Sequence, residues 1–248
     1  LGMDSVAITD HGSMYGVIEF YKQATKKGIK PIIGCEVYVS EKDHKIKDPT
    51  NKRYYHLILL AENETGYKNL VKIVSEAYVN GFYYKPRVSF DFIKDHTEGL
   101  IALSACLNGE VNQRILENDM EAALSTAKKY EDAFGKGNYF LEIQDHGIPE
   151  QRQVNKGVAY LHRKLGIEMV ATNDVHYIER EDSYLQDVLL CIQTGALVKD
   201  EDRMRMPNRE FYLKDPATMA EIFKDYERAV ENTTKIADRC KLCLLYTS

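Results

Sequence analysis

Side chains that bind metal ions or transfer protons stand beside several apolar, β-branched segments of this sequence. Six of them lie at five such segments, and they are His11, Glu36, His56, Cys106, Asp174 and His176. Imidazole, thiolate and carboxylate groups together form the ligand set of zinc and similar transition metals. Because six candidates exceed the four ligands of one tetrahedral ion, the set predicts a centre with more than one ion.

Two members of this set carry more weight than the others. Glu36 lies within the apolar segment 31–39, where an unpaired buried carboxylate would cost several kcal/mol, so a cation is expected beside it. Asp174 and His176 are two residues apart, and an extended backbone would place both side chains on one face. Taken singly, His11 also fits a turn and Cys106 a small buried hydrophobic residue.

The elements that must position these residues follow from the periodicity of the apolar residues. Strands are expected at 5–9, 31–39, 54–61, 100–103, 139–143 and 168–172, and helices at 14–27, 66–79, 119–134 and 149–165. Strands that alternate with helices and read as apolar runs predict an α/β fold with a parallel sheet, closed or nearly closed into a barrel. The carboxyl ends of parallel strands share one rim, where the six residues would meet.

Composition excludes several classes of protein. The chain has 248 residues, of which 44% are hydrophobic and 29% charged, which excludes a disordered tail or a disulfide mini-protein. No stretch approaches the roughly 20 apolar residues of a membrane helix, so no membrane partner is expected. Five cysteines without a secretory context favour a reducing cytoplasm. A net charge of −5 provides no global attraction for nucleic acid.

The regular alternation stops where charge density rises, from Lys199 to Arg209. We therefore expect a barrel domain at 1–198 and a charged linker with a helical extension at 199–242. Leu1 and Gly2 resemble the end of a helix, so we expect an upstream segment. Residues 243–248 match a translated sequencing adapter, with an ordinary chain end as the alternative.

Five motifs carry a resemblance to a known family. They are Thr9-Asp10-His11-Gly12, Gly34-Cys35-Glu36-Val37-Tyr38, Tyr55-His56-Leu57-Ile58, Leu103-Ser104-Ala105-Cys106-Leu107 and Thr172-Asn173-Asp174-Val175-His176-Tyr177. Over residues 1 to about 242 the sequence resembles the polymerase-and-histidinol-phosphatase (PHP) family, in the form that opens the alpha subunit of bacterial DNA polymerase III. Lys85-Pro86-Arg87-Val88 and Glu210-Phe211-Tyr212-Leu213-Lys214 resemble the polymerase members more than the free-standing phosphatases.

The resemblance implies a distorted, TIM-like barrel of seven strands, here without its first strand, that holds two or three zinc, manganese or iron ions. The six residues above match its metal ligands, and the remaining ligands would precede Leu1. It implies metal-dependent phosphoester hydrolysis, in the form of a 3′–5′ exonuclease, with Asp174, His176 and Glu36 as catalytic residues. A metal-free structural platform and a free-standing phosphatase of the histidinol-phosphate type are the alternatives.

The resemblance also implies a role for the whole subunit. It would be a cytoplasmic bacterial DNA-directed DNA polymerase that uses primer-template DNA, deoxynucleoside triphosphates and magnesium, beside a proofreading subunit and a sliding clamp. The carboxylates of that polymerase site would lie beyond residue 248, so this chain would be a fragment.

Several further polar residues receive predictions of their own. Asp10 is a candidate to orient His11, and His146 is expected at the substrate rim. Solvent exposure is expected for His44, His96, His162, Arg87, Arg203, Arg205 and Arg209, with phosphate contact as the alternative for the arginines.

Overall fold

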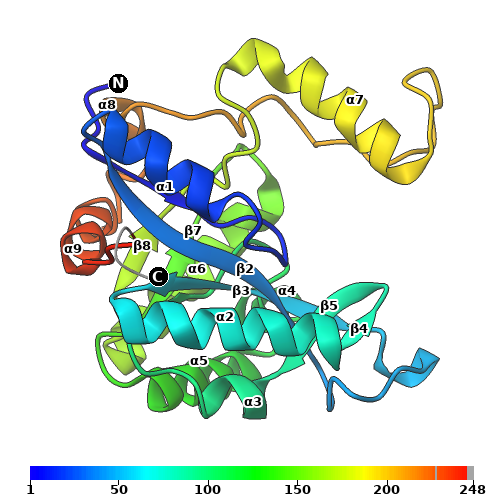
Figure 1. Ribbon diagram of the computed structural model, residues 1–248, viewed down its shortest axis with the longest axis vertical. Coiled ribbons are helices and arrows are strands. Elements are labelled where there is room, and N and C mark those ends of the chain that lie inside the picture. The colour runs from blue at the N-terminus through cyan, green and yellow to red at the C-terminus, as the bar shows by residue number, and fades with distance from the viewer. Residues whose placement is uncertain (227, 245–248) are drawn as a thin grey trace.

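The structure is a computed structural model that describes residues 1–226 and 228–244. A curled half-barrel sheet runs through its centre (Figure 1). The strands are β1 (Ser5–Ile8), β2 (Lys30–Ser40), β3 (Tyr54–Ala61), β4 (Phe82–Tyr83), β5 (Lys85–Ser89), β6 (Leu100–Leu103), β7 (Tyr139–Ile143) and β8 (Met169–Ala171). The sheet order β4-β5-β2-β3-β6-β7-β8, with β1 beside β2, confirms the predicted α/β fold and agrees with a distorted TIM-like barrel.

Helices connect the strands and cover the sheet. They are α1 (Val17–Lys26), α2 (Glu64–Val79), α3 (Phe90–Lys94), α4 (Glu110–Leu116), α5 (Met120–Phe134), α6 (Pro149–Leu165), α7 (Ser183–Thr194), α8 (Pro216–Ile222) and α9 (Glu231–Arg239). Local chemistry sets their ends: the Asp119 side chain accepts a hydrogen bond from Ala122 N at the start of α5. Helix α6 begins with Pro149 and is followed directly by Gly166, whose positive φ of 73° is typical of the residue that ends a helix.

The prediction of a wholly parallel sheet is wrong at β3. This strand is antiparallel to both of its neighbours, β2 and β6. The physical reason is that residues 41–53, which join β2 to β3, contain only a short 3₁₀ turn and no crossover helix. Because β3 runs backwards, its first residues lie at the rim where β2 ends, and His56 pairs with Tyr38.

Apolar packing holds the two faces of the sheet. On one face, Val37, Leu57 and Leu59 pack with Leu70 and Ile73 of α2 in a cluster of fully buried side chains. On the other face, residues of β3 and β6 pack with α9. Figure 1 shows α2, α3 and α5 together on one side of the sheet and α1 on the other.

The segment after β8 leaves the barrel and returns to it. Helix α7 extends away from the body (Figure 1), whereas Tyr212 returns to form a parallel bridge with Tyr177 at the rim. The domain division at residue 198 remains a prediction. Residues 243–248 were expected to be an adapter-derived tail. Of these, residues 245–248 lie outside the described part of the chain, whereas Leu244 packs beside Val17. No helix in the described residues is long and apolar enough to cross a membrane.

Candidate metal centre

Glu36 lies at the centre of the candidate site. Its side chain projects from β2 and the residue is 3% exposed. The carboxylate oxygen Oε1 accepts a hydrogen bond of 2.6 Å from His11 Nδ1 and lies 2.9 Å from His56 Nδ1. Backbone hydrogen bonds hold His11 there, because Gly12 N donates to Glu36 O and Glu36 N donates to Asp10 O. The predicted burial of Glu36 is confirmed, and its partners are two histidines.

The charges of this group are coupled. Burial alone would raise the pKa of Glu36, but hydrogen bonds from His11 and His56 outweigh it and lower the pKa to about 2. The hydrogen bond to Glu36 raises the pKa of His11 in turn. The carboxylate is therefore ionised at neutral pH and attracts positive charge, either a protonated histidine or a metal ion.

His56 and Cys106 form a second pair beside Glu36. Cys106 Sγ lies 3.4 Å from His56 Nδ1, and the ligand atoms of these three residues all lie within 4.8 Å of one another. His56 stands at the rim because β3 is antiparallel, and its backbone N donates to Asn108 O in the turn that carries Cys106. Burial raises the pKa of the Cys106 thiol well above its usual value, so a neighbouring cation is needed for a thiolate at neutral pH.

His11 and His176 face each other across the rim. Their Nε2 atoms lie 3.4 Å apart. Two imidazoles bound to one tetrahedral zinc at 2.0–2.1 Å would place their nitrogens about 3.3 Å apart. His176 Nδ1 lies 2.7 Å from the backbone oxygen of Asp174, a hydrogen bond that fixes the ring and leaves Nε2 free for a ligand.

The segment around Asp174 is not extended, so the predicted alternation of its side chains is wrong. Asp174 has a positive φ of 44°, and its Oδ1 atom lies 3.9 Å from His176 Nδ1. Burial raises the pKa of Asp174, and His176 partly opposes this effect. Asp174 therefore lies at the edge of the site and outside the close Glu36, His56 and Cys106 group.

Residues that we did not predict hold this bend in place. Asn173 Nδ2 donates to the backbone oxygens of Glu210 and Tyr212, and Asn173 Oδ1 accepts from Lys214 Nζ at 3.1 Å. Lys214 is 5% exposed, and burial lowers its pKa. The signal available in the sequence was the Glu210-Phe211-Tyr212-Leu213-Lys214 motif, in which the lysine follows three apolar or aromatic residues.

Three predictions of solvent exposure are wrong. Arg87 is fully buried, and its guanidinium donates to the backbone oxygens of Asn51 and Ile46. Arg203 forms an ion pair of 2.6 Å with Asp187. His44 is 3% exposed, its Nδ1 lies 2.9 Å from Ser89 Oγ, and its Nε2 lies 2.8 Å from Glu76 Oε1. Each of these side chains holds a loop in place through contacts with residues distant in sequence, and the sequence around each residue does not indicate those contacts.

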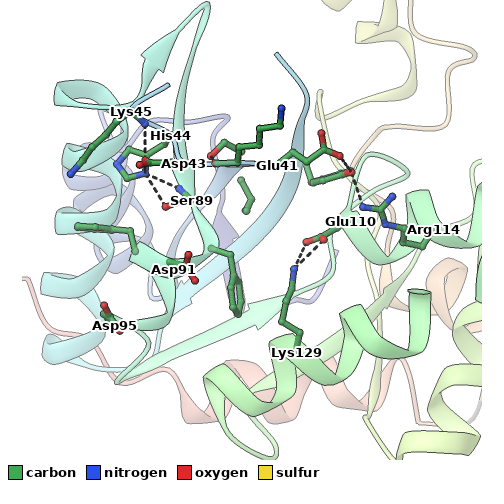
Figure 2. Close-up of a pocket in the computed structure, with 16 residues that line it drawn as sticks. Glu41, Asp43, His44, Lys45, Ser89, Asp91, Asp95, Glu110, Arg114 and Lys129 are labelled. Atoms are coloured by element: carbon green, nitrogen blue, oxygen red, sulfur yellow. Dashed lines mark hydrogen bonds and ion pairs between the residues drawn. The ribbon is translucent and has the colours of Figure 1, made fainter. Parts of the chain in front are cut away.

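His44 lines a cavity of about 510 Å³ that is separate from the candidate metal residues (Figure 2). The cavity has mixed charge, and Lys129 points to Glu110, which also lines it. His146 is also buried rather than on an open substrate rim, because its ring stacks on Phe211 and its Nε2 lies 2.8 Å from Asn173 O. Arg205 and Arg209 are exposed, as predicted.

Comparison with known proteins decides the family. The sequence profile of the PHP domain matches residues 1–146. The chain belongs to the PHP domain family. This fold is metal-dependent, and the close Glu36, His56 and Cys106 group is a suitable ligand set for an ion.

Longer relatives match almost the whole of this PHP chain. It is 46% identical to DNA polymerase III subunit alpha of Treponema pallidum over 244 residues and 46% identical to the subunit of Borreliella burgdorferi over 240 residues. It is 43% identical to the subunit of Thermus aquaticus over 246 residues. These alignments cover 96–98% of this chain but only 20–21% of the relatives, so the chain spans about a fifth of their length.

Proposed function

We propose that this PHP domain binds two or three zinc, manganese or iron ions and hydrolyses phosphodiesters at the 3′ end of a nucleic acid. The observation that carries the proposal is the convergence of His11, Glu36, His56, Cys106 and His176 at one rim. The facing nitrogens of His11 and His176 suit one ion, and the Glu36, His56 and Cys106 group suits a neighbouring one. When bound, such ions acidify water and neutralise the charge that develops on a phosphoryl group.

The side chains have distinct roles in this proposal. Glu36 Oε1 contacts one histidine of each subsite, His11 and His56, so it can hold the two subsites together. His176 is oriented by the backbone oxygen of Asp174, which leaves its Nε2 directed at the site. Asp174 stands at the edge of the site beside His176, where its carboxylate can hold an ion or accept a proton from attacking water. Asp10 remains a candidate to orient His11.

We further propose that the chain is part of a bacterial DNA polymerase III alpha subunit, a cytoplasmic DNA-directed DNA polymerase. The relatives that carry this name support the proposal. The whole subunit would use primer-template DNA, deoxynucleoside triphosphates and magnesium at a site outside this chain, with a proofreading subunit and a sliding clamp as partners. The alternative is a free-standing PHP phosphatase.

The length of the natural reading frame separates these two proteins. Genomic sequence around this chain should show a frame about five times as long, because the chain spans 21% of its relatives. A stop codon close to residue 248 in the natural frame would favour the free-standing phosphatase and overturn the polymerase proposal.

Hydrolysis of a labelled primer by the complete subunit tests the site itself. Asp174→Asn keeps the side-chain volume but removes the charge, so hydrolysis should fall at least 100-fold while primer extension changes little. Asp145→Asn is the matched control, because Asp145 Oδ1 accepts a hydrogen bond from Gly147 N outside the ligand group. Equal hydrolysis by the parent and Asp174→Asn would show that the proposed site is wrong. A complete subunit that does not hydrolyse the primer at all would favour a metal-free structural platform.

A further inference from the structure

A second group of polar side chains surrounds a small cavity behind the turn that carries Cys106. The cavity has a volume of about 10 Å³, the size of one water molecule. Glu142 of β7, Asn112 of α4 and Asn155 of α6 line it. All three residues are nearly inaccessible to solvent, at 4%, 2% and 2% exposure.

One oxygen of each of these side chains has no hydrogen-bond partner among the described residues. The three atoms are Glu142 Oε2, Asn112 Oδ1 and Asn155 Oδ1. Buried polar atoms in native proteins are rarely left unpaired, because each costs about 1–3 kcal/mol. Three such atoms around one cavity indicate that the cavity holds an occupant.

The orientation of both amides is fixed by the backbone. Asn112 Nδ2 donates to the carbonyl oxygens of Ala105 and Cys106, at 3.0 and 2.8 Å. Asn155 Nδ2 donates to the carbonyl oxygen of Gln144 at 2.9 Å. Rotating either amide would place oxygen against oxygen, so both unpaired atoms are acceptors.

Glu142 brings the negative charge of the cavity. Its other oxygen, Oε1, accepts hydrogen bonds from Gln144 Nε2 at 2.9 Å and from Thr172 Oγ1. Burial nevertheless raises the pKa of Glu142 to about 7. The group therefore contains one ionisable carboxylate and two neutral carbonyl oxygens, with no cationic side chain among the residues that line it.

The number of acceptors restricts the occupant. A water molecule has two hydrogens and would leave one of three acceptors unpaired while Glu142 is ionised. A cation contacts all three at once. A divalent ion would exceed the single negative charge of the carboxylate, and magnesium in addition keeps several waters for which a cavity of about 10 Å³ has no room. A single positive charge balances the single carboxylate.

We propose that this cavity binds one alkali cation, held by Glu142 Oε2, Asn112 Oδ1 and Asn155 Oδ1. The ion would tie α4 and α6 to β7. Through Asn112 it would also support the turn of Cys106, whose backbone oxygen accepts from that side chain. The cavity adjoins the candidate metal centre, because Cys106 also lines it, but none of the three proposed ligands belongs to that centre and the proposal does not depend on the proposed hydrolysis.

The test measures thermal unfolding of the full chain in chelator, which removes divalent ions, with sodium, potassium, lithium or choline chloride at equal concentration. The melting temperature should be several degrees higher in one alkali salt than in choline, and the shift should saturate with concentration. Glu142→Gln should lose the difference between salts. Glu168→Gln should keep it, because the Glu168 side chain is 39% exposed and far from full burial.

A crystal grown in rubidium chloride provides a second readout that does not require a variant to fold. An anomalous peak between the three oxygens would support the proposal. Equal melting temperatures in all four salts would overturn it, as would a water without anomalous signal between the oxygens. That second result would instead indicate a protonated Glu142 that donates to the water.

Discussion

The Nε2 atoms of His11 and His176 lie 3.4 Å apart, although 165 positions separate the two residues in the sequence. Within the described residues these two Nε2 atoms have no other hydrogen-bond partner, and the rings are held through their Nδ1 atoms, that of His11 by Glu36 and that of His176 by the Asp174 backbone. Two ring nitrogens held in this way form a ready pair of ligands for one ion.

If the two histidines bind one ion, their substitutions should not be additive. His11→Ala and His176→Ala should each weaken zinc binding at least tenfold, and the double variant should lose less than the product of the two effects. Competition with a coloured chelator measures these affinities. His162→Ala is the control, because His162 Nδ1 bonds to Ile167 O outside the site. Fully additive losses would show that the histidines act at separate ions.

Lys214 should support the site without touching it. Its amine donates to Asn173 Oδ1, and Asn173 precedes the bend at Asp174. Lys214→Met keeps the apolar stem and removes the donor, so zinc affinity should fall about 10- to 100-fold, the range for residues that orient metal ligands. Circular dichroism should remain that of the parent. Unchanged affinity would mean that the bend holds without the lysine.

Gly109 permits a close approach in the turn after Cys106. A Cβ atom at this position would overlap the backbone oxygen of Ser104. Gly109→Ala should therefore destabilise the fold by about 1–3 kcal/mol, as overpacking does, and it should displace Cys106. Urea unfolding measures the loss. Gly137→Ala is the control for the loss of stability that any glycine substitution brings. A Cβ atom at Gly137 would meet nothing within 4 Å, so only the positive φ of 83° opposes that substitution.

The buried His44 should make stability depend on Glu76 at neutral pH. The hydrogen bond from His44 lowers the pKa of Glu76 in the folded protein. The ionised Glu76 therefore adds to the free energy of unfolding above its unfolded pKa, near 4.5, and this stabilisation is lost as the pH falls through the folded pKa. Glu76→Gln should melt a few degrees below the parent at pH 7. The difference should shrink in acid below about pH 4.

The matched variant on the same helix is Glu64→Gln, which removes only an exposed pair with Lys68. It should change the melting temperature little at either pH. If the difference in melting temperature between the parent and Glu76→Gln increased in acid, it would contradict the proposed direction of the pKa shift.

Long apolar patterns in the sequence predicted their elements well. Strands 54–61 and 100–103 and helix 149–165 have the predicted bounds, because each combines clear periodicity with strong end signals. Helices α3 and α4, strands β4 and β5, and helix α7 were missed. The first four are short, and α7 exposes much of its apolar surface instead of burying one face, so periodicity does not mark them.

The residue types of the candidate ligands could be predicted from the sequence, but the residues that hold the surrounding loops and strands in place could not. Glu36 was predicted because a carboxylate in an apolar strand requires a partner. The burial of Arg87 and His44 depends on loop residues distant in sequence, and no local pattern encodes those contacts. His56 reached the rim through an antiparallel strand, whose direction follows from the connection between β2 and β3.

The most direct test of the candidate centre is zinc binding by this chain after dialysis against chelator, followed by calorimetric titration. We predict at least one equivalent of tightly bound zinc in the parent, with affinity reduced at least tenfold in Glu36→Gln, whose volume is the same but whose charge is gone. Binding should release protons, because the Cys106 thiol must ionise and the His11 pKa is raised. A folded parent that binds no zinc, or a Glu36→Gln variant that binds it equally well, would contradict the account.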